Sequence, residues 1–154
     1  MRDENKHFKG NIYLRDADKE DCDLIYRWAN DETVRKNAFN SEPIEYESHV
    51  IWYSELLLDG TQHQYILMHD NIPVGQLRLS QIEESVEIDY SVAPEKRKGG
   101  YGTIILELSK EKAKEVFPNA KNLIGKVKPE NGPSAQCFEK NGFFEKYRCY
   151  EMEL

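Results

Sequence analysis

Hydrophobic and polar positions recur along the chain with two different periods, and each period predicts a type of element. Apolar residues that recur every three or four positions mark one face of a helix, whereas alternation or a β-branched run marks a strand. By this pattern, helices are expected at 18–30, 45–58, 103–116 and 134–141. Strands are expected at 11–15, 64–68, 72–79, 85–92 and 122–127, and one or two more at 143–154.

Turn-forming residues between these elements indicate how the strands connect. Asp70-Asn71 is typical of a hairpin turn, and the short spacing of the neighbouring strands predicts an antiparallel meander over 62–93. The helix at 103–116 then connects the last strand of the meander to the strand at 122–127. Such a strand–helix–strand crossover joins parallel strands. We therefore expect an α+β fold with a mixed, mostly antiparallel sheet and about four helices.

Composition narrows the class of protein. The 154 residues are 39% hydrophobic with a formal net charge of −7, so a nucleic-acid binder is not expected. No apolar run approaches the ~20 residues of a membrane span, and no signal peptide is recognisable. Three cysteines without a C-x-x-C pair favour a cytoplasmic protein, and four scattered histidines predict no metal site. The length predicts a single domain over 1–154, with a polar tail at 1–10.

A basic, glycine-rich segment lies between the strand at 85–92 and the helix at 103–116. It contains Gly99, Gly100 and Gly102 directly after the run Lys96-Arg97-Lys98. Glycines allow the backbone to turn tightly, and successive amides at the start of a helix bind anions. The segment therefore predicts a pyrophosphate cradle, and a glycine-rich surface turn with solvated lysines is the alternative.

Two motifs carry a resemblance to a known family. Residues 97–102, Arg-Lys-Gly-Gly-Tyr-Gly, fit the pattern R/Q-x-x-G-x-G/A, and residues 131–143 look like N-x-x-S/A-x-x-x-[YF]-x-K-x-G-F. Both motifs, in this order, resemble the GNAT superfamily of acyl-CoA-dependent N-acyltransferases. The resemblance implies a single GNAT-like domain in which the fourth and fifth strands splay apart.

The resemblance also implies acetyl-CoA as co-substrate. The loop amides would hold the CoA pyrophosphate, the end of the fourth strand would bond the pantetheine arm as a strand does, and an asparagine would face it from the other side. The cofactor-binding residues expected on this basis are Tyr90, Ser91, Val92, Arg97, Lys98, Gly99, Gly100, Tyr101, Gly102, Thr103 and Asn131.

Direct acetyl transfer needs a base for the amine and a proton for the departing thiolate. Glu87 and Asp89 are two residues apart on a strand, so they share one face and are candidate bases; solvent-side charges are the alternative. Phe138 stands where the family usually has a tyrosine acid, so that role cannot be carried over. Ser134 is a candidate catalytic residue in its place, and other tyrosines (Tyr101, Tyr147) or solvent are further alternatives.

The acceptor is expected to bind around residues 26–60. The stretch 26–35 resembles two GNAT branches, one acting on ribosomal-protein N-termini and one on amino-sugar nucleotides of the pseudaminic-acid type. The residues expected to bind the acceptor are Arg27, Trp28, His49, Trp52 and Tyr53, and Arg27 and Arg35 could meet a diphosphate.

An amino-sugar nucleotide is therefore the leading acceptor, so the expected partner is a small-molecule amine, without nucleic acid or membrane. A peptide α-amine is the first alternative, and a non-catalytic acyl-CoA sensor is the second. Monomer and homodimer both remain open.

Overall fold

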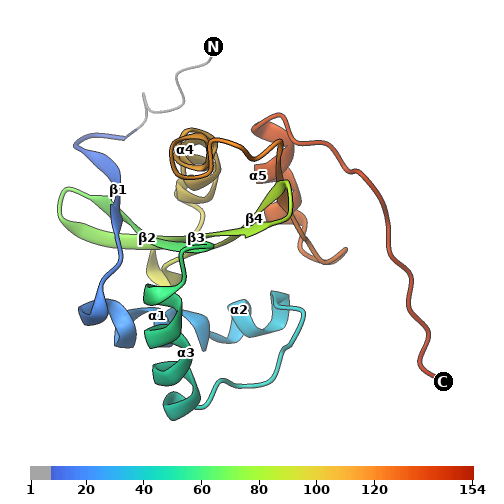
Figure 1. The fold of residues 1–154 in the computed structure, drawn as a ribbon, viewed down its shortest axis with the longest axis horizontal. Helices are drawn as coiled ribbons and strands as arrows, with labels where there is room; N and C mark the ends of the chain where they lie inside the picture. The colour runs from blue at the N-terminus through green and yellow to red at the C-terminus, as the bar shows by residue number, and fades with distance from the viewer. Residues whose placement is uncertain (1–7) are drawn as a thin grey trace.

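A computed structural model describes residues 8–154 and shows three layers (Figure 1). A central five-stranded sheet has α4 and α5 on one face and α1, α2 and α3 on the other. The strands are β1 (Ile12–Asp16), β2 (Gln62–His69), β3 (Ile72–Ile82), β4 (Ser85–Val92) and β5 (Asn122–Gly125). The helices are α1 (Cys22–Ala29), α2 (Glu32–Asn37), α3 (Tyr46–Leu58), α4 (Tyr101–Val116) and α5 (Gly132–Lys140), with short 3-10 turns η2 (Lys19–Asp21) and η3 (Pro94–Lys96).

The sheet confirms the mixed topology expected from the sequence. Its order is β1-β2-β3-β4-β5, with antiparallel pairing up to β4 and a parallel β4–β5 pair. Asp70 and Asn71 join β2 to β3 with φ angles of 52° and 78°, the left-handed region that a tight hairpin requires. Glu83, at φ 55°, lies in the turn between β3 and β4. The antiparallel meander and the crossover through α4 are therefore both confirmed.

One helix was not expected. The pair Asn30-Asp31 ends α1, but Asp31 also begins α2, because its side chain accepts a hydrogen bond from the Val34 backbone N–H at 3.2 Å. A capping aspartate followed by only six helical residues gives too short a stretch for periodicity to reveal.

Alternation along the strands divides the core into two clusters. Leu77 and Leu79 of β3 pack with Ile105 on the α4 face, whereas Ile66 of β2 packs with Trp28 on the α1–α3 face. The same alternation sorts the side chains of β4, because successive residues of a strand point to opposite faces. Val86, Ile88, Tyr90 and Val92 face α4, so Glu87, Asp89 and Ser91 face the layer of α1, α2 and α3.

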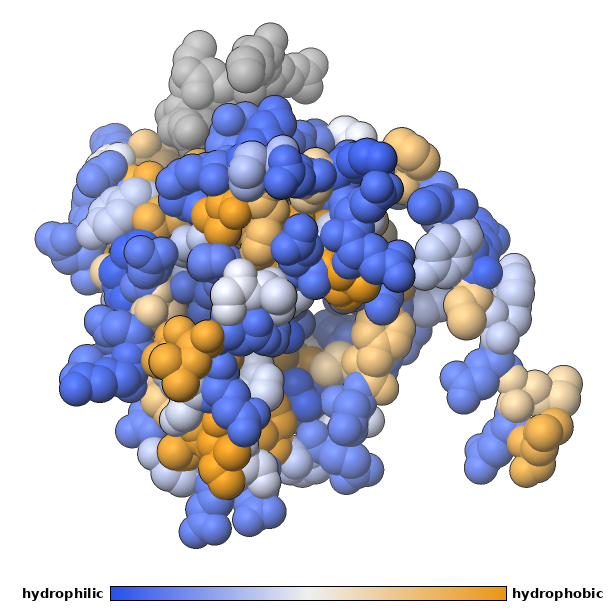
Figure 2. Space-filling model, in the orientation of Figure 1, coloured by the Kyte–Doolittle hydropathy of each residue, from blue (hydrophilic) through white to orange (hydrophobic). Residues whose placement is uncertain are grey.

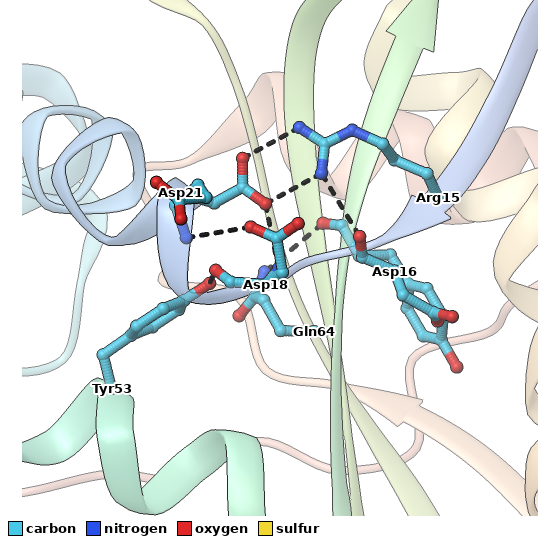
Figure 3. A network of polar contacts seen from close by, with 8 residues as sticks. Arg15, Asp16, Asp18, Asp21, Tyr53 and Gln64 are labelled. Atoms are coloured by element: carbon cyan, nitrogen blue, oxygen red, sulfur yellow. Dashed lines mark hydrogen bonds and ion pairs between the residues drawn. The ribbon is translucent and has the colours of Figure 1, made fainter.

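A polar network attaches that layer to the sheet (Figure 3). Arg15 of β1 donates two hydrogen bonds to Asp21, at 2.7 and 2.8 Å, and Tyr53 of α3 donates to the Asp18 carbonyl at 2.6 Å. The hydrogen bond from Arg15 lowers the pKa of Asp21. The network therefore ties β1, the start of α1 and the middle of α3 together at one end of the sheet.

The expected strands at 143–154 are absent from the structure. Phe143 still packs edge-on against Phe138, and its N–H bonds the Phe138 carbonyl at 3.1 Å, but residues 144–154 have no regular structure. Figure 1 shows this segment running clear of the body. A strand needs a neighbour for its backbone groups, and the segment has none here, so that prediction is wrong for the single chain. Among residues 8–154, no helix combines the length and the apolar character that a membrane crossing requires.

Candidate active site

The sheet opens between β4 and β5. Their pairing stops at Ile88 and Gly125, while β4 continues through 89–92, where β3 is its only paired strand within the described part of the chain. Phe138 of α5 packs directly on Gly125: a methyl group built on that glycine would lie 2.2 Å from the ring carbon Cζ. The opening leaves one edge of β4 available to an extended ligand with amide groups, as the splayed pair expected from the sequence requires.

The glycine-rich loop leads from β4 into α4. Lys98 and Gly100 have φ angles of 65° and 88°, and Gly100 is the N-cap of α4. Among residues 8–154 no side chain caps this helix, and its first turn carries no acidic residue, so its first amides are available to an anion. Gly102 allows α4 to approach α5, since a methyl group there would lie 3.3 Å from Cys137 Sγ. The backbone of this loop therefore suits a pyrophosphate.

An ion pair connects the loop to the opposite face of the sheet. The Arg97 guanidinium bonds the Asp31 carboxylate at the start of α2. Burial alone raises the pKa of Asp31, but hydrogen bonds from Arg97 and from the Val34 N–H outweigh it and the pKa is lowered. The loop and the capped end of α2 are thus held in one position.

Two carboxylates lie beside the opening on the α1–α3 face. Glu87 is 3.3 Å from Lys126 Nζ and its side chain is 24% exposed. Asp89 lies 3.5 Å from Arg78 and accepts a hydrogen bond from Gln76 Nε2 at 3.1 Å. Both therefore occupy the face expected of them, and each has a cation as neighbour.

The support of Asp89 was not foreseen. Gln64 donates to Gln76 at 2.6 Å, and Gln76 donates to both Asp89 and Ser91, so a chain of buried amides reaches β4 from β2. Both glutamines are buried. The sequence does carry a signal of this network. Strand alternation places the two glutamines at inward positions among apolar neighbours, and buried amides need hydrogen-bond partners.

Two hydroxyl groups meet on the other face, below the opening. Tyr90 Oη and Ser134 Oγ are 2.8 Å apart, and the Tyr90 ring packs edge-on against Phe138 with centroids 5.9 Å apart. Burial raises the pKa of Tyr90, so its phenol stays protonated. Asn131 caps α5 by accepting from the Ser134 N–H at 3.4 Å. Tyr90 was expected to bind the cofactor, but the contact of its hydroxyl with Ser134 was not foreseen from the sequence.

The other proposed proton donors lie elsewhere. Tyr101 bonds His69 on β2 at 2.6 Å, and Tyr147 is exposed in the segment outside the body. Cys137 is half-buried, with its Sγ 3.6 Å from Thr103 Oγ1, and packs between α5 and the start of α4. Within residues 8–154, no group of histidine, cysteine and acidic side chains is placed to hold a metal ion.

Most of the side chains expected to bind the acceptor are in the core. Trp28, His49 and Tyr53 are 3%, 2% and 2% exposed, and His49 Nε2 bonds the Cys22 carbonyl at 2.9 Å. They pack α1 and α3 against the sheet, so direct contact with an acceptor is not open to them. Of that set, only Arg27 and Trp52 are at the surface.

Arg35 is also occupied by the fold. It donates to the carbonyls of Ala29, Asn40 and Glu42, at 2.6, 3.1 and 3.3 Å, and so closes the loop after α2. Because its donors are used by the protein backbone, Arg35 is not available to a diphosphate.

Solved structures share this fold. Spermidine N-acetyltransferase from Vibrio cholerae, in complex with CoA and spermine, is 20% identical with a TM-score of 0.79, covering 88% of this chain and 82% of that chain. A domain from Methanocaldococcus jannaschii is 20% identical with a TM-score of 0.79, covering 93% and 94%. An aminoglycoside acetyltransferase with coenzyme A is 18% identical with a TM-score of 0.76, covering 88% and 86%. No curated protein matches the sequence.

The sequence itself identifies the family. Residues 11–144 match the acetyltransferase (GNAT) domain, which is most of the chain. The match contains the glycine-rich loop, the open β4 edge and the α5 motif described above. The chain therefore belongs to the GNAT family of acetyltransferases, and its activity is N-acetyl transfer from acetyl-CoA.

Proposed function

We propose that this acetyltransferase acts on the primary amine of an amino-sugar nucleotide, by direct attack on the thioester. The observation that carries the catalytic part is the division of polar groups about one strand. Glu87 and Asp89 lie on one face of β4, and the Tyr90–Ser134 pair lies on the other. A base and a proton donor on opposite sides of an opening suit a reaction in which the amine enters from one side and the thiolate leaves on the other.

Acetyl-CoA would occupy the α4–α5 face. The backbone of 97–103 holds the pyrophosphate, with Lys98 adding positive charge, and the free edge of β4 at 90–92 bonds the pantetheine arm. Asn131 faces the arm from α5. A backbone N–H on that edge polarises the thioester carbonyl and stabilises the oxyanion.

Glu87 is the base in this proposal. Asp89 is already engaged by Gln76 and Arg78, whereas Glu87 has Lys126 as its one ion-pair partner. Glu87 takes a proton from the ammonium group, directly or through water. The neutral nitrogen then bonds the carbonyl carbon, the carbon–sulfur bond breaks, and the nitrogen gives its second proton to solvent water as the amide forms. Asp89 is a positioning residue that shapes the acceptor face.

Ser134 and Tyr90 supply the proton that Phe138 cannot. The Ser134 hydroxyl gives its proton to the departing thiolate and is resupplied by the Tyr90 phenol, which burial keeps protonated. The phenol regains a proton from solvent after product release. A CoA thiol is a good leaving group, so this help is worth about the lower end of the 10²–10⁴-fold range for acid catalysis.

Charge on the acceptor face favours a sugar-type amine over a polyamine. Both carboxylates beside the opening face a cation, which leaves little net negative charge to attract a polycation. Arg78 lies over the half-exposed Trp52 ring, 5.1 Å from its centroid, and this stacked pair offers a flat surface to a sugar or nucleobase. Arg27, exposed on α1, adds a positive charge for a phosphate.

A panel of amines tests the acceptor. Purified protein is given acetyl-CoA with amino-sugar nucleotides, an aminoglycoside, spermidine or short peptides, and thiol release is measured. We expect kcat/KM to be highest with an amino-sugar nucleotide. Preferred turnover of a peptide would support the α-amine alternative, and tight acetyl-CoA binding without turnover of any amine would support the sensor alternative.

A second experiment tests the proton donor. Ser134→Ala and Tyr90→Phe should each lower kcat by about 10²-fold. The CoA affinity should stay within about threefold in both variants. Tyr13→Phe is the matched control, because it removes a phenol on β1 whose partner is Asn71. Unchanged kcat in both site variants would exclude the hydroxyl pair as the proton source.

A further inference from the structure

Residues 30–44, called the bridge loop below, are tied together by their own polar side chains. Asn30 bonds both backbone groups of Ile44, at 2.8 Å each, so the two ends of the loop are joined. Inside the loop, Arg35 donates to two carbonyls of the second half. A loop with joined ends and internal hydrogen bonds holds its shape as one unit.

Burial contributes little to the attachment of the bridge loop. Its helix, α2, contains no buried residue, and Phe39 beyond the helix is 68% exposed. In Figure 2, hydrophilic atoms cover most of the visible surface, and hydrophobic atoms form only separate patches. Most helices in proteins are stabilised by packing of an apolar face. Because α2 buries no such face, its position depends on polar contacts.

Two polar contacts attach α2 to opposite sides of the opening in the sheet. At the start of the helix, the Asp31 carboxylate accepts a hydrogen bond from Arg97, which lies in the loop after β4. At its end, Lys128, in the segment after β5, donates to the Lys36 carbonyl at 3.1 Å. Figure 1 shows α2 below the sheet, on the side of β4 and α5. One end of α2 is therefore held from the β4 side and the other from the β5 side.

The length of α2 suits this arrangement. Neighbouring strands lie about 4.8 Å apart, so an opening that admits one extended ligand between two strands is about 10 Å wide. The six residues of α2 extend about 9 Å along the helix axis. The helix also presents its negative end to a lysine, as the helix dipole favours. It is thus long enough to reach from one side of the opening to the other, on the α1–α3 face.

We propose that Arg97 and Lys128 are positioning residues, which hold α2 across the opening so that the bridge loop forms one wall of the amine site. The Arg97 side chain, which the sequence assigned to the pyrophosphate, then serves the amine instead. The proposal rests on the proposed entry of the amine from the α1–α3 face, but not on the identity of the acceptor. Loss of either contact frees one end of α2 and leaves the backbone that binds CoA in place.

Steady-state kinetics with the best amine of the panel test this role. Asp31→Asn removes the charge, but asparagine still caps a helix, and Arg97→Gln removes the partner. Each variant should raise KM for the amine by about 3- to 10-fold, while the CoA affinity by calorimetry stays within about threefold. Glu32→Gln is the matched control, because it makes the same charge change at an exposed position of α2. An unchanged KM in both site variants would overturn the proposal.

A second comparison separates the two uses of positive charge in the loop. Lys98→Gln should weaken CoA binding, since Lys98 is exposed beside the cradle, whereas Arg97→Gln should not. Arg97→Lys keeps the charge and should restore part of the affinity for the amine. The double variant Asp31→Asn/Arg97→Gln should have about the KM of the worse single variant, because the two residues act through one contact. Additive effects, or equal losses of CoA affinity in Arg97→Gln and Lys98→Gln, would contradict the proposal.

Hydrogen exchange tests the attachment of α2 without any acceptor. Amides of 32–44 should exchange faster in Asp31→Asn, Arg97→Gln and Lys128→Ala than in the natural chain, whereas Glu32→Gln should change nothing. If no amine of the panel is acetylated, the proposed function fails, and this measurement still decides whether the two contacts hold the helix. Exchange that is the same in all four variants would refute the bridging role.

Discussion

On the face of the sheet covered by α4 and α5, the candidate site consists largely of backbone: left-handed residues in the loop, uncapped amides at the start of α4 and a free edge on β4. On the face covered by α1–α3, it consists of side chains held by other side chains, such as Asp89 between Gln76 and Arg78. A backbone site depends on a few residue types at fixed spacing. A side-chain site depends on neighbours that are distant in sequence. The two faces should therefore respond differently to substitution.

The largest effect is expected on the side-chain face. Glu87→Gln should lower kcat by about 10²–10⁴-fold, because the amide cannot accept the ammonium proton. The CoA affinity, measured by calorimetry, should stay within about threefold, since the proposed CoA site is on the other face. Glu84→Gln is the control, as Glu84 lies in the turn before β4 and pairs only with Lys121 on the surface. If Glu87→Gln has the same kcat as the natural chain between pH 6 and 9, Glu87 is not the base.

On the backbone face, Gly100→Val should weaken CoA binding by about 10- to 100-fold. A β-branched residue at φ 88° is strained by about 1–3 kcal/mol, and relief of that strain displaces the loop amides. Gly132→Ala is the control, since its backbone does not need a positive φ and a methyl group there meets no atom within 4 Å. Equal affinities for Gly100→Val and the natural chain would mean that CoA does not use the loop.

Phe138→Tyr tests a residue that lies where the two faces meet. A tyrosine here would match the family's usual acid, but the end of the Phe138 ring lies against Gly125. A hydroxyl group added at Cζ would crowd β5, so the variant should lose about 1–3 kcal/mol in its free energy of unfolding and gain no turnover. Denaturant unfolding and steady-state kinetics measure the two effects. A rise in kcat would contradict the packing described for this ring.

The smallest effect concerns the network that supports the α1–α3 face. Because Asp21 has a lowered pKa in the folded protein, its ion pair stabilises the fold above the unfolded pKa, near 3.9, and this contribution disappears as the pH falls through the folded value. Arg15→Gln should therefore cost about 1 kcal/mol at pH 7, and less below pH 4. Lys114→Gln, which removes an exposed pair with Glu111, is the control. A cost independent of pH would contradict the linkage.

The sequence predicted the tight turn on the backbone face, because glycines at close spacing before a helix allow the left-handed conformations seen at Lys98 and Gly100. That this loop binds CoA stays a prediction. It was insufficient for contacts between distant elements. Tyr90 and Ser134 are 44 residues apart, and neither carries a local signal of the other. The burial of His49 and Tyr53 was readable, since with Leu56 they form an i, i+4, i+7 stripe on α3. The resemblance to other acetyltransferases selected side chains of α1 and α3 for the acceptor, and three of them, Trp28, His49 and Tyr53, are buried in the core.

The opening beside β4 also has a consequence for hydrogen exchange. Up to Ile88, β4 is a central strand with neighbours on both sides, and from Asp89 to Val92 it is an edge strand. Amide hydrogens that face β3 exchange only when the sheet opens, whereas those that face the gap exchange with solvent directly. One strand therefore contains two classes of amide, and occupancy of the gap by a ligand backbone would slow the exchange of the second class alone.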